Sequence, residues 1–71
     1  MTLPERLVEI RKSRNLTQKQ LAAGVNISEV GLQNYENGRR KPAYDVLIAL
    51  ADFFNVSLDY LCGRSDDPTM H

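Results

Sequence analysis

TQKQLAAGVNISEVGLQNYENG, residues 17–38, is the stretch of sequence that decides the fold. Thr17 and Ser28 each carry a hydroxyl that can accept a hydrogen bond from the first turn of a helix, which makes them candidate N-caps. Gln20 follows Thr17 at the spacing of a capping box, in which each side chain bonds to the other residue's backbone N–H group. The stretch therefore predicts a short helix, a tight turn and a second short helix that ends at Gly38.

One further helix is expected before this stretch. Thr2 is its candidate N-cap and Glu5 lies at the capping-box position, so the helix should begin near Leu3. It should run to about Arg14, with its apolar residues at helical spacing. The residues expected to form its apolar stripe are Leu3, Leu7, Val8 and Ile10.

Two more helices are expected after the central stretch. Pro42 opens one over residues 44–54, although Ala43 stands at its cap position and has no side-chain acceptor, which costs about 1 kcal/mol. Ser57 starts a brief helix that Gly63 stops. The residues of the longer helix that are expected to pack inward are Tyr44, Leu47, Ile48, Leu50, Ala51 and Phe54.

The remaining signals complete an all-α fold of five helices in one small domain. Asn26 and Asn55 lie at two turns that need a left-handed residue, a conformation that asparagine tolerates better than other non-glycine residues. No strand-like alternation of apolar and polar residues occurs in the 71-residue chain. We assign the domain to residues 1–63 and expect residues 64–71, which show no periodicity, to form a flexible, frayed tail.

Composition excludes several classes of protein. Apolar residues make up 42% of the chain and charged residues 25%, which is ordinary for a globular domain. No apolar run approaches the roughly 20 residues of a membrane span and no signal peptide is visible, so we expect a cytoplasmic protein. Cys62 and His71 are single residues of their types, which leaves no metal cluster and no nucleophilic dyad. We therefore expect no enzyme activity, no metal, no cofactor and no small-molecule ligand domain.

The second helix of the central stretch has a polar outer face. Ile27, Leu32 and Tyr35 are expected to face the core, which leaves the opposite side of the helix for a partner. Two short helices joined by a tight turn, with such a face, are typical of units that place side chains in the major groove of double-stranded DNA. The residues expected to contact base edges are Ser28, Glu29, Val30, Gln33 and Asn34.

Three of these side chains match the chemistry of particular bases. Asn34 could bind adenine through N6 and N7, Glu29 could accept a hydrogen bond from cytosine N4, and Val30 could touch a thymine methyl group. Because phosphates repel a carboxylate, Glu29 could instead stabilise the first turn of its own helix. Gly31, on the same face, would let the helix backbone approach the groove closely.

Basic residues follow the predicted second helix directly. The formal net charge is zero, but Arg39-Arg40-Lys41 form a run while acidic residues gather toward the C-terminus. This run should lie beside the phosphate backbone, and a solvated surface is the alternative. At the start of the preceding helix, the Gln18 side chain and free N–H groups can meet a phosphate. The residues expected to contact phosphates are Gln18, Asn37, Arg39, Arg40 and Lys41.

Several short motifs, taken together, resemble the helix-turn-helix domains of phage repressors and Xre-type bacterial regulators. They are Thr17-Gln18-x-x-Leu21-Ala22, Ile27-Ser28, Leu32, Tyr35-Glu36-Asn37-Gly38-Arg39-Arg40-Lys41-Pro42 and Val56-Ser57-Leu58-Asp59-Tyr60-Leu61. The resemblance covers residues 3–63 and implies a five-helix lambda repressor-like domain. It also implies a structural ion pair between Arg11 and Glu36, which match an arginine and a glutamate that pair in such repressors.

A single unit of this kind reads too few base pairs for useful specificity, so a homodimer on two half-sites is expected. A second apolar stripe could form its interface, or could simply enlarge the core. The leading interpretation is a sequence-specific transcriptional regulator, a repressor that binds a palindromic operator. The alternative is a protein-interaction adaptor, or an antitoxin that neutralises a toxin. The expected dimer-interface residues are Val46, Ala49, Phe53, Leu58 and Tyr60.

Overall fold

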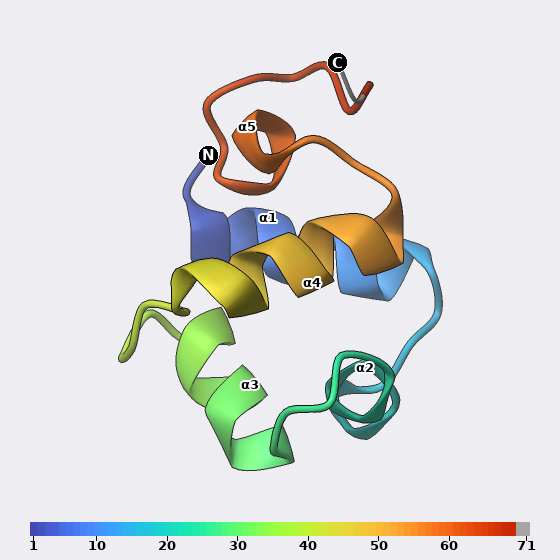
Figure 1. Cartoon of the computed structure of the whole chain (residues 1–71), viewed down its shortest axis with the longest axis vertical. Coiled ribbons are helices and arrows are strands. Elements are labelled where there is room, and N and C mark those ends of the chain that lie inside the picture. The colour runs from blue at the N-terminus through green and yellow to red at the C-terminus, as the bar shows by residue number, and fades with distance from the viewer. Residues whose placement is uncertain (70–71) are drawn as a thin grey trace.

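The computed structural model describes residues 1–69, which pack into a body of 29 × 21 × 21 Å. The all-α architecture predicted from the sequence is confirmed, and the described residues contain no strand. Helix α4 crosses the middle of the molecule, with α5 on one side of it and α2 and α3 on the other (Figure 1). Residues 70 and 71, including His71, lie outside the described part. The helices are α1 (Leu3–Ser13), α2 (Gln18–Gly24), α3 (Glu29–Glu36), α4 (Tyr44–Phe54) and α5 (Leu58–Leu61).

Two complete capping boxes begin the first two helices, as the sequence predicts. At α2, the Gln20 N–H donates to Thr17 Oγ1 at 3.0 Å, and the Thr17 N–H donates to Gln20 Oε1 at 2.9 Å. At α1, the Thr2 N–H donates to Glu5 Oε1 at 3.0 Å, and Thr2 Oγ1 accepts from the Glu5 N–H. Each box satisfies N–H groups that a helix start would otherwise leave without partners.

The other helix starts follow the same rule with one exception. Ser28 Oγ accepts from the Gly31 N–H at 2.9 Å, and Ser57 Oγ accepts from the Tyr60 N–H at 3.0 Å. Ala43 accepts no side-chain cap bond at the start of α4, which confirms the predicted weak point. Hydroxyl caps therefore fix where four of the helices begin. They are Thr2 for α1, Thr17 for α2, Ser28 for α3 and Ser57 for α5.

Asparagine and glycine provide the left-handed residues at the turns. Asn26 and Asn55 have φ angles of 58° and 57°, which confirms their predicted conformation. Asn15, which the sequence analysis did not identify, adopts a φ of 56° after α1. Gly63 has a φ of 78°, and a Cβ at this position would collide with the carbonyl oxygen of Met1. Gly63 thus allows the start of the chain to lie directly against the end of α5.

All five helices contribute to one hydrophobic core. Fully burying a leucine or phenylalanine side chain contributes about 1.5–3 kcal/mol, so this core is the main source of stability for such a short chain. None of the helices formed by residues 1–69 has both the length and the apolar character needed to cross a membrane. The side chains that are completely buried are Leu7, Leu21, Leu32, Leu50, Phe54 and Leu61.

Tyr44 differs from its predicted core position. It is the first residue of α4 and its exposure is 73%. Helical side chains tilt toward the N-terminus of their helix, so a side chain in the first turn extends beyond the helix end instead of over the packed face. The prediction that Tyr44 packs inward is therefore wrong, although its spacing matched the apolar stripe of α4.

The segment 64–69, which the sequence predicts to be a flexible tail, makes contacts with the rest of the domain. It contains no helix, but it folds back over α5 and the start of α1 (Figure 1). The Ser57 N–H donates to the Pro68 carbonyl oxygen at 3.0 Å. The buried guanidinium of Arg6 donates to Asp66 Oδ1 at 3.3 Å, which adds a second carboxylate to the one that Glu9 already provides. No local pattern in the sequence predicts contacts between residues so far apart in the chain.

Candidate nucleic-acid interface

Helices α2 and α3 form the compact pair predicted for residues 17–38 (Figure 1). The turn between them is closed by the Ile27 N–H, which donates to the Ala22 carbonyl oxygen at 2.9 Å, and by the left-handed Asn26. Leu32 is completely buried, and Ile27 and Tyr35 pack partly buried against the core. One side of α3 is thus fixed to the domain, and its other side is left for solvent or a partner.

The five predicted base-contacting residues are the N-cap of α3, Ser28, and four residues within the helix. Val30 is 65% exposed, so its methyl groups are accessible to a partner. Ser28 is exposed, but its oxygen already accepts the cap bond, so its hydroxyl proton is the part left to donate. Glu29 and Gln33 are also exposed, whereas Asn34 is only partly so. Four of the five are therefore accessible to a partner and Asn34 is partly so, and the set has mixed apolar and polar character.

A buried carboxylate holds α3 against α1 and α2. Glu36 accepts from Arg11 Nε at 2.7 Å and from Arg11 Nη2 at 3.2 Å, so the ion pair implied by the resemblance is present and bidentate. Arg11 also donates to the Leu16 carbonyl oxygen at 2.9 Å. The exposures of the two charged side chains are 12% for Arg11 and 5% for Glu36. Such geometry fixes the orientation of α3 more than it adds net stability.

Gln18 takes part in the same network, which the sequence analysis did not foresee. Its side-chain amide donates from Nε2 to Glu36 Oε1 at 3.0 Å and is partly buried. Gln18 is the first residue of α2, so this bond joins the start of α2 to the end of α3. A phosphate contact from Gln18 would therefore come from an amide that is already oriented by Glu36.

The loop after α3 presents three cations to solvent. Asn37 Oδ1 accepts from the Arg39 N–H at 3.2 Å, and the same N–H donates to the Asn34 carbonyl oxygen at 3.0 Å, so the loop begins in a defined conformation. Arg39, Arg40 and Lys41 are all exposed, and none forms an ion pair within residues 1–69. These three side chains are free to meet an anionic partner.

Three other arginines bond to groups within the domain, so the basic surface is narrower than the sequence suggests. Arg11 is used by Glu36, and Arg6 lies buried beside Asp66. Arg14 donates to the Phe54 carbonyl oxygen at 2.7 Å, which satisfies an acceptor at the end of α4. These assignments depend on helices that meet only in the folded chain, and residue type alone does not reveal them.

The predicted dimer-interface residues are partly exposed. Phe53 is 40% exposed and contacts Phe54 edge to face, with ring centroids 5.3 Å apart. Its ring also lies against Gly24 of α2, where an added Cβ would be only 2.6 Å from Phe53 Cε2. The Arg6 guanidinium covers the Tyr60 ring at 3.9 Å from the centroid. The residues that pack against the core from this set are Val46, Leu58 and Tyr60.

The chemistry of this surface is that of recognition. Within residues 1–69, no group of three or more histidine, cysteine, aspartate or glutamate side chains could hold a metal ion. Cys62 is a partly buried free thiol. The accessible groups on α3 and its following loop are hydrogen-bond donors and acceptors, one aliphatic side chain and three cations, which suit non-covalent contacts to an anionic, patterned partner.

The chain is similar in sequence to known transcriptional regulators. The chain is 42% identical over 66 residues to the HTH-type transcriptional regulator ImmR of Bacillus subtilis (strain 168). This alignment covers 93% of this chain and 52% of ImmR. It is 41% identical over 64 residues to the cryptic phage CTXphi transcriptional repressor RstR of Vibrio cholerae, covering 90% of this chain and 57% of RstR. The chain thus spans about half the length of these relatives.

A solved structure and a family model extend the match to the fold. The P22 c2 repressor protein, solved in complex with a synthetic operator, superposes with a TM-score of 0.85 at 28% identity and covers 92% of this chain and 98% of that one. These relatives are transcriptional regulators and repressors, not enzymes. The model of the helix-turn-helix family matches residues 7–61. This chain therefore belongs to the helix-turn-helix family, in the Xre and lambda repressor-like group that its motifs resemble.

Proposed function

We propose that this protein is a sequence-specific transcriptional regulator, most simply a repressor, that binds double-stranded DNA through α3 in the major groove. The observation that carries the proposal is the exposed face of α3 beside three exposed cations of the following loop, which form no ion pair within residues 1–69. The similar P22 c2 repressor was solved with an operator, and the similar RstR is named a repressor. A regulator of this kind acts on the chromosome, so we place it in the cytoplasm.

The proposed contacts divide into base readout and phosphate positioning. Asn34 would read adenine, and Val30 would contact a thymine methyl group. The cations of the loop would neutralise phosphates, which makes binding depend strongly on salt. We assign base contacts to Ser28, Glu29, Val30, Gln33 and Asn34, and phosphate contacts to Gln18, Asn37, Arg39, Arg40 and Lys41.

We further propose that two copies bind a palindromic operator. A homodimer places two α3 helices on half-sites about one turn of DNA, or 34 Å, apart. The proposed interface is the set Val46, Ala49, Phe53, Leu58 and Tyr60. Its support is the exposed ring of Phe53, which makes an apolar surface near the end of α4.

Selection from a random duplex DNA library tests the proposal. We expect the recovered sequences to share a two-fold symmetric motif. Asn34→Ala should relax the preference at one position in each half-site and weaken binding there by about 1–3 kcal/mol, because the base loses a bidentate partner. Lys12→Ala is the control, because it removes an exposed cation from α1 and not from α3 or the following loop. It should leave the motif unchanged.

Absence of any motif above background would overturn sequence-specific binding. The zero net charge and the exposed Glu29 would then favour an adaptor or antitoxin that docks on another protein. A motif without two-fold symmetry would support sequence-specific DNA binding but would overturn the proposal that a homodimer binds a palindromic operator.

A further inference from the structure

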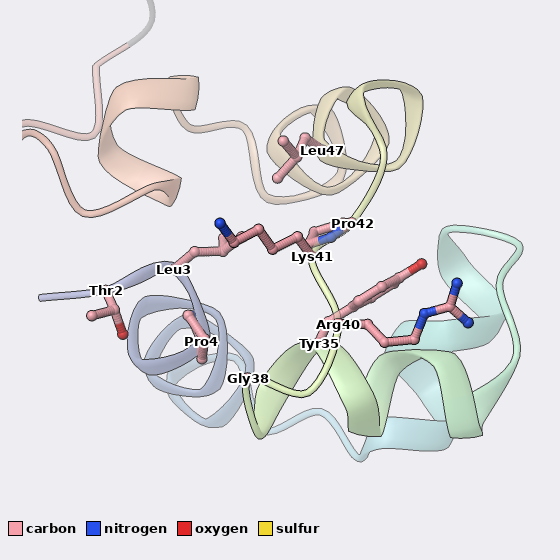
Figure 2. A pocket seen from close by; sticks show the side chains of 9 residues that line it. All are labelled: Thr2, Leu3, Pro4, Tyr35, Gly38, Arg40, Lys41, Pro42 and Leu47. Atoms are coloured by element: carbon pink, nitrogen blue, oxygen red, sulfur yellow. The ribbon is translucent and has the colours of Figure 1, made fainter.

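An apolar cavity of about 430 Å³ lies between the start of α1, the end of α3, the following loop and α4. It adjoins the proposed DNA-binding surface, but none of the proposed base-contacting residues lines it. Pockets that hold small organic molecules begin at about 300 Å³, so the space is large enough for a compact ligand. Its apolar walls come from Leu3, Pro4, Tyr35, Pro42 and Leu47 (Figure 2).

Two cations border this apolar space. Lys41 and Arg40 line the cavity, both are exposed, and neither has an ion-pair partner within the described residues. In Figure 2, the Lys41 side chain extends from the loop toward Leu3, whereas Arg40 points the other way, alongside Tyr35. No acidic residue lines the cavity. The combination of apolar walls and uncompensated positive charge is complementary to an amphipathic anion.

We propose that this cavity binds a small carboxylate with a compact aromatic or aliphatic body, and that the bound carboxylate weakens DNA binding. The apolar body would lie among Leu3, Pro42 and Leu47, and the carboxylate would pair with Lys41. The effect on DNA rests on the proposed function, in which Lys41 contacts a phosphate. The binding of the ligand itself does not depend on it.

The coupling follows from competition for charge. A carboxylate that occupies Lys41 removes one phosphate contact, and each lost contact lowers the dependence of log affinity on log salt by about one unit. The ligand would thus act within the DNA-binding domain itself, without a rearrangement of α3.

Titration of the whole chain with phenylacetate, followed by backbone amide chemical shifts, tests the cavity directly. At about 10 mM, a site with a Kd of about 1 mM would be about 90% occupied. We expect shifts to concentrate at Tyr35, Gly38 and Leu47. Phenylacetamide, which has the same ring and no charge, should bind at least about threefold more weakly.

A matched pair of charge variants separates this site from general charge effects. Lys41→Gln should weaken phenylacetate binding at least about threefold, whereas Lys12→Gln, an exposed lysine of α1 outside the cavity, should not change it. Absence of shifts at the cavity, equal binding of phenylacetamide, or equal effects of the two variants would each overturn the proposed ligand class.

Fluorescence anisotropy on the selected DNA tests the second half. Phenylacetate should lower the affinity of the unmodified chain at fixed ionic strength, and phenylacetamide should lower it less. Carboxylate binding without a change in DNA affinity would overturn the coupling and leave the site. Failure of the chain to bind any DNA would reject the proposed function, while the titration without DNA would still decide the ligand site.

Discussion

At the scale of single residues, Glu36 is the group at which three helices meet. Its two carboxylate oxygens accept from Arg11 of α1 and from Gln18 of α2, and the residue itself ends α3. The side chain is almost completely buried, so its charge is compensated by protein groups and not by water. One carboxylate therefore sets how three helices meet at the proposed DNA-binding unit.

Removal of this carboxylate should destabilise the domain strongly. Glu36→Ala leaves Arg11 buried without its partner, which typically costs about 3 kcal/mol in the free energy of unfolding. Glu9→Ala is the matched control, because Glu9 pairs with Arg6 but is 49% exposed, and should cost about 1 kcal/mol or less. Urea unfolding measures both. Equal losses in the two variants would contradict the structural role of Glu36.

At the scale of the helix, the quality of each N-cap differs along the chain. Hydroxyl caps begin α1, α2, α3 and α5, whereas Ala43 at α4 offers no acceptor. Asp45 compensates in part, because its Oδ1 accepts from the Val46 N–H at 3.0 Å. Helix α4 contains two of the completely buried core residues, so its first turn is a point where the local sequence and the tertiary packing disagree.

Ala43→Ser should correct this weak start. Ala43 already has the extended conformation of an N-cap, with φ −66° and ψ 162°, so a serine hydroxyl could accept a bond without a backbone change. Because Asp45 already supplies one acceptor, we expect the free energy of unfolding to rise by about 0.5–1 kcal/mol, as measured by thermal unfolding. Ser57→Ala should give a loss of similar size at α5. A decrease in stability for Ala43→Ser would contradict this explanation.

The first capping box makes the start of α1 sensitive to acid. Hydrogen bonds from the Thr2 backbone and hydroxyl hold the pKa of Glu5 below its ordinary value. A carboxyl with a lowered pKa in the folded state stabilises the fold above its unfolded pKa, and this contribution is lost as pH falls through the folded pKa. Glu5→Gln should flatten the decline in stability in that range, measured by urea unfolding as a function of pH. An unchanged slope would contradict the role of Glu5.

At the scale of the whole molecule, local signals predict the helices better than they predict the charged contacts. The hydroxyl caps and Asn26 act within a few residues of chain, so spacing alone identifies the α2–α3 unit. Gln18, Arg14 and Arg6 find partners 18, 40 and 60 residues away, and no local pattern encodes such pairs. The exposed face of α3 is predictable because its buried face is periodic.

Assembly is the prediction that belongs to this scale. Phe53→Glu should place a charge in the proposed two-fold interface and weaken dimerisation at least about tenfold in sedimentation experiments. Because Phe53 also contacts Gly24, the variant requires a thermal unfolding curve to show that the domain remains folded. Asp52→Ala, at an exposed neighbouring position, should leave the association unchanged. An undiminished dimer in the folded Phe53→Glu variant would place the interface elsewhere.

The close approach of Met1 to Gly63 has a consequence for how this domain can be built into longer polypeptides. The start of the chain lies beside α5 and residues 64–69 pass around that helix, both on the side of α4 away from α2 and α3 (Figure 1). A module fused before Met1 or after residue 69 would therefore be attached on that shared side. Fusion partners, tethers or labels can therefore be attached in either order while the outer face of α3 stays unobstructed.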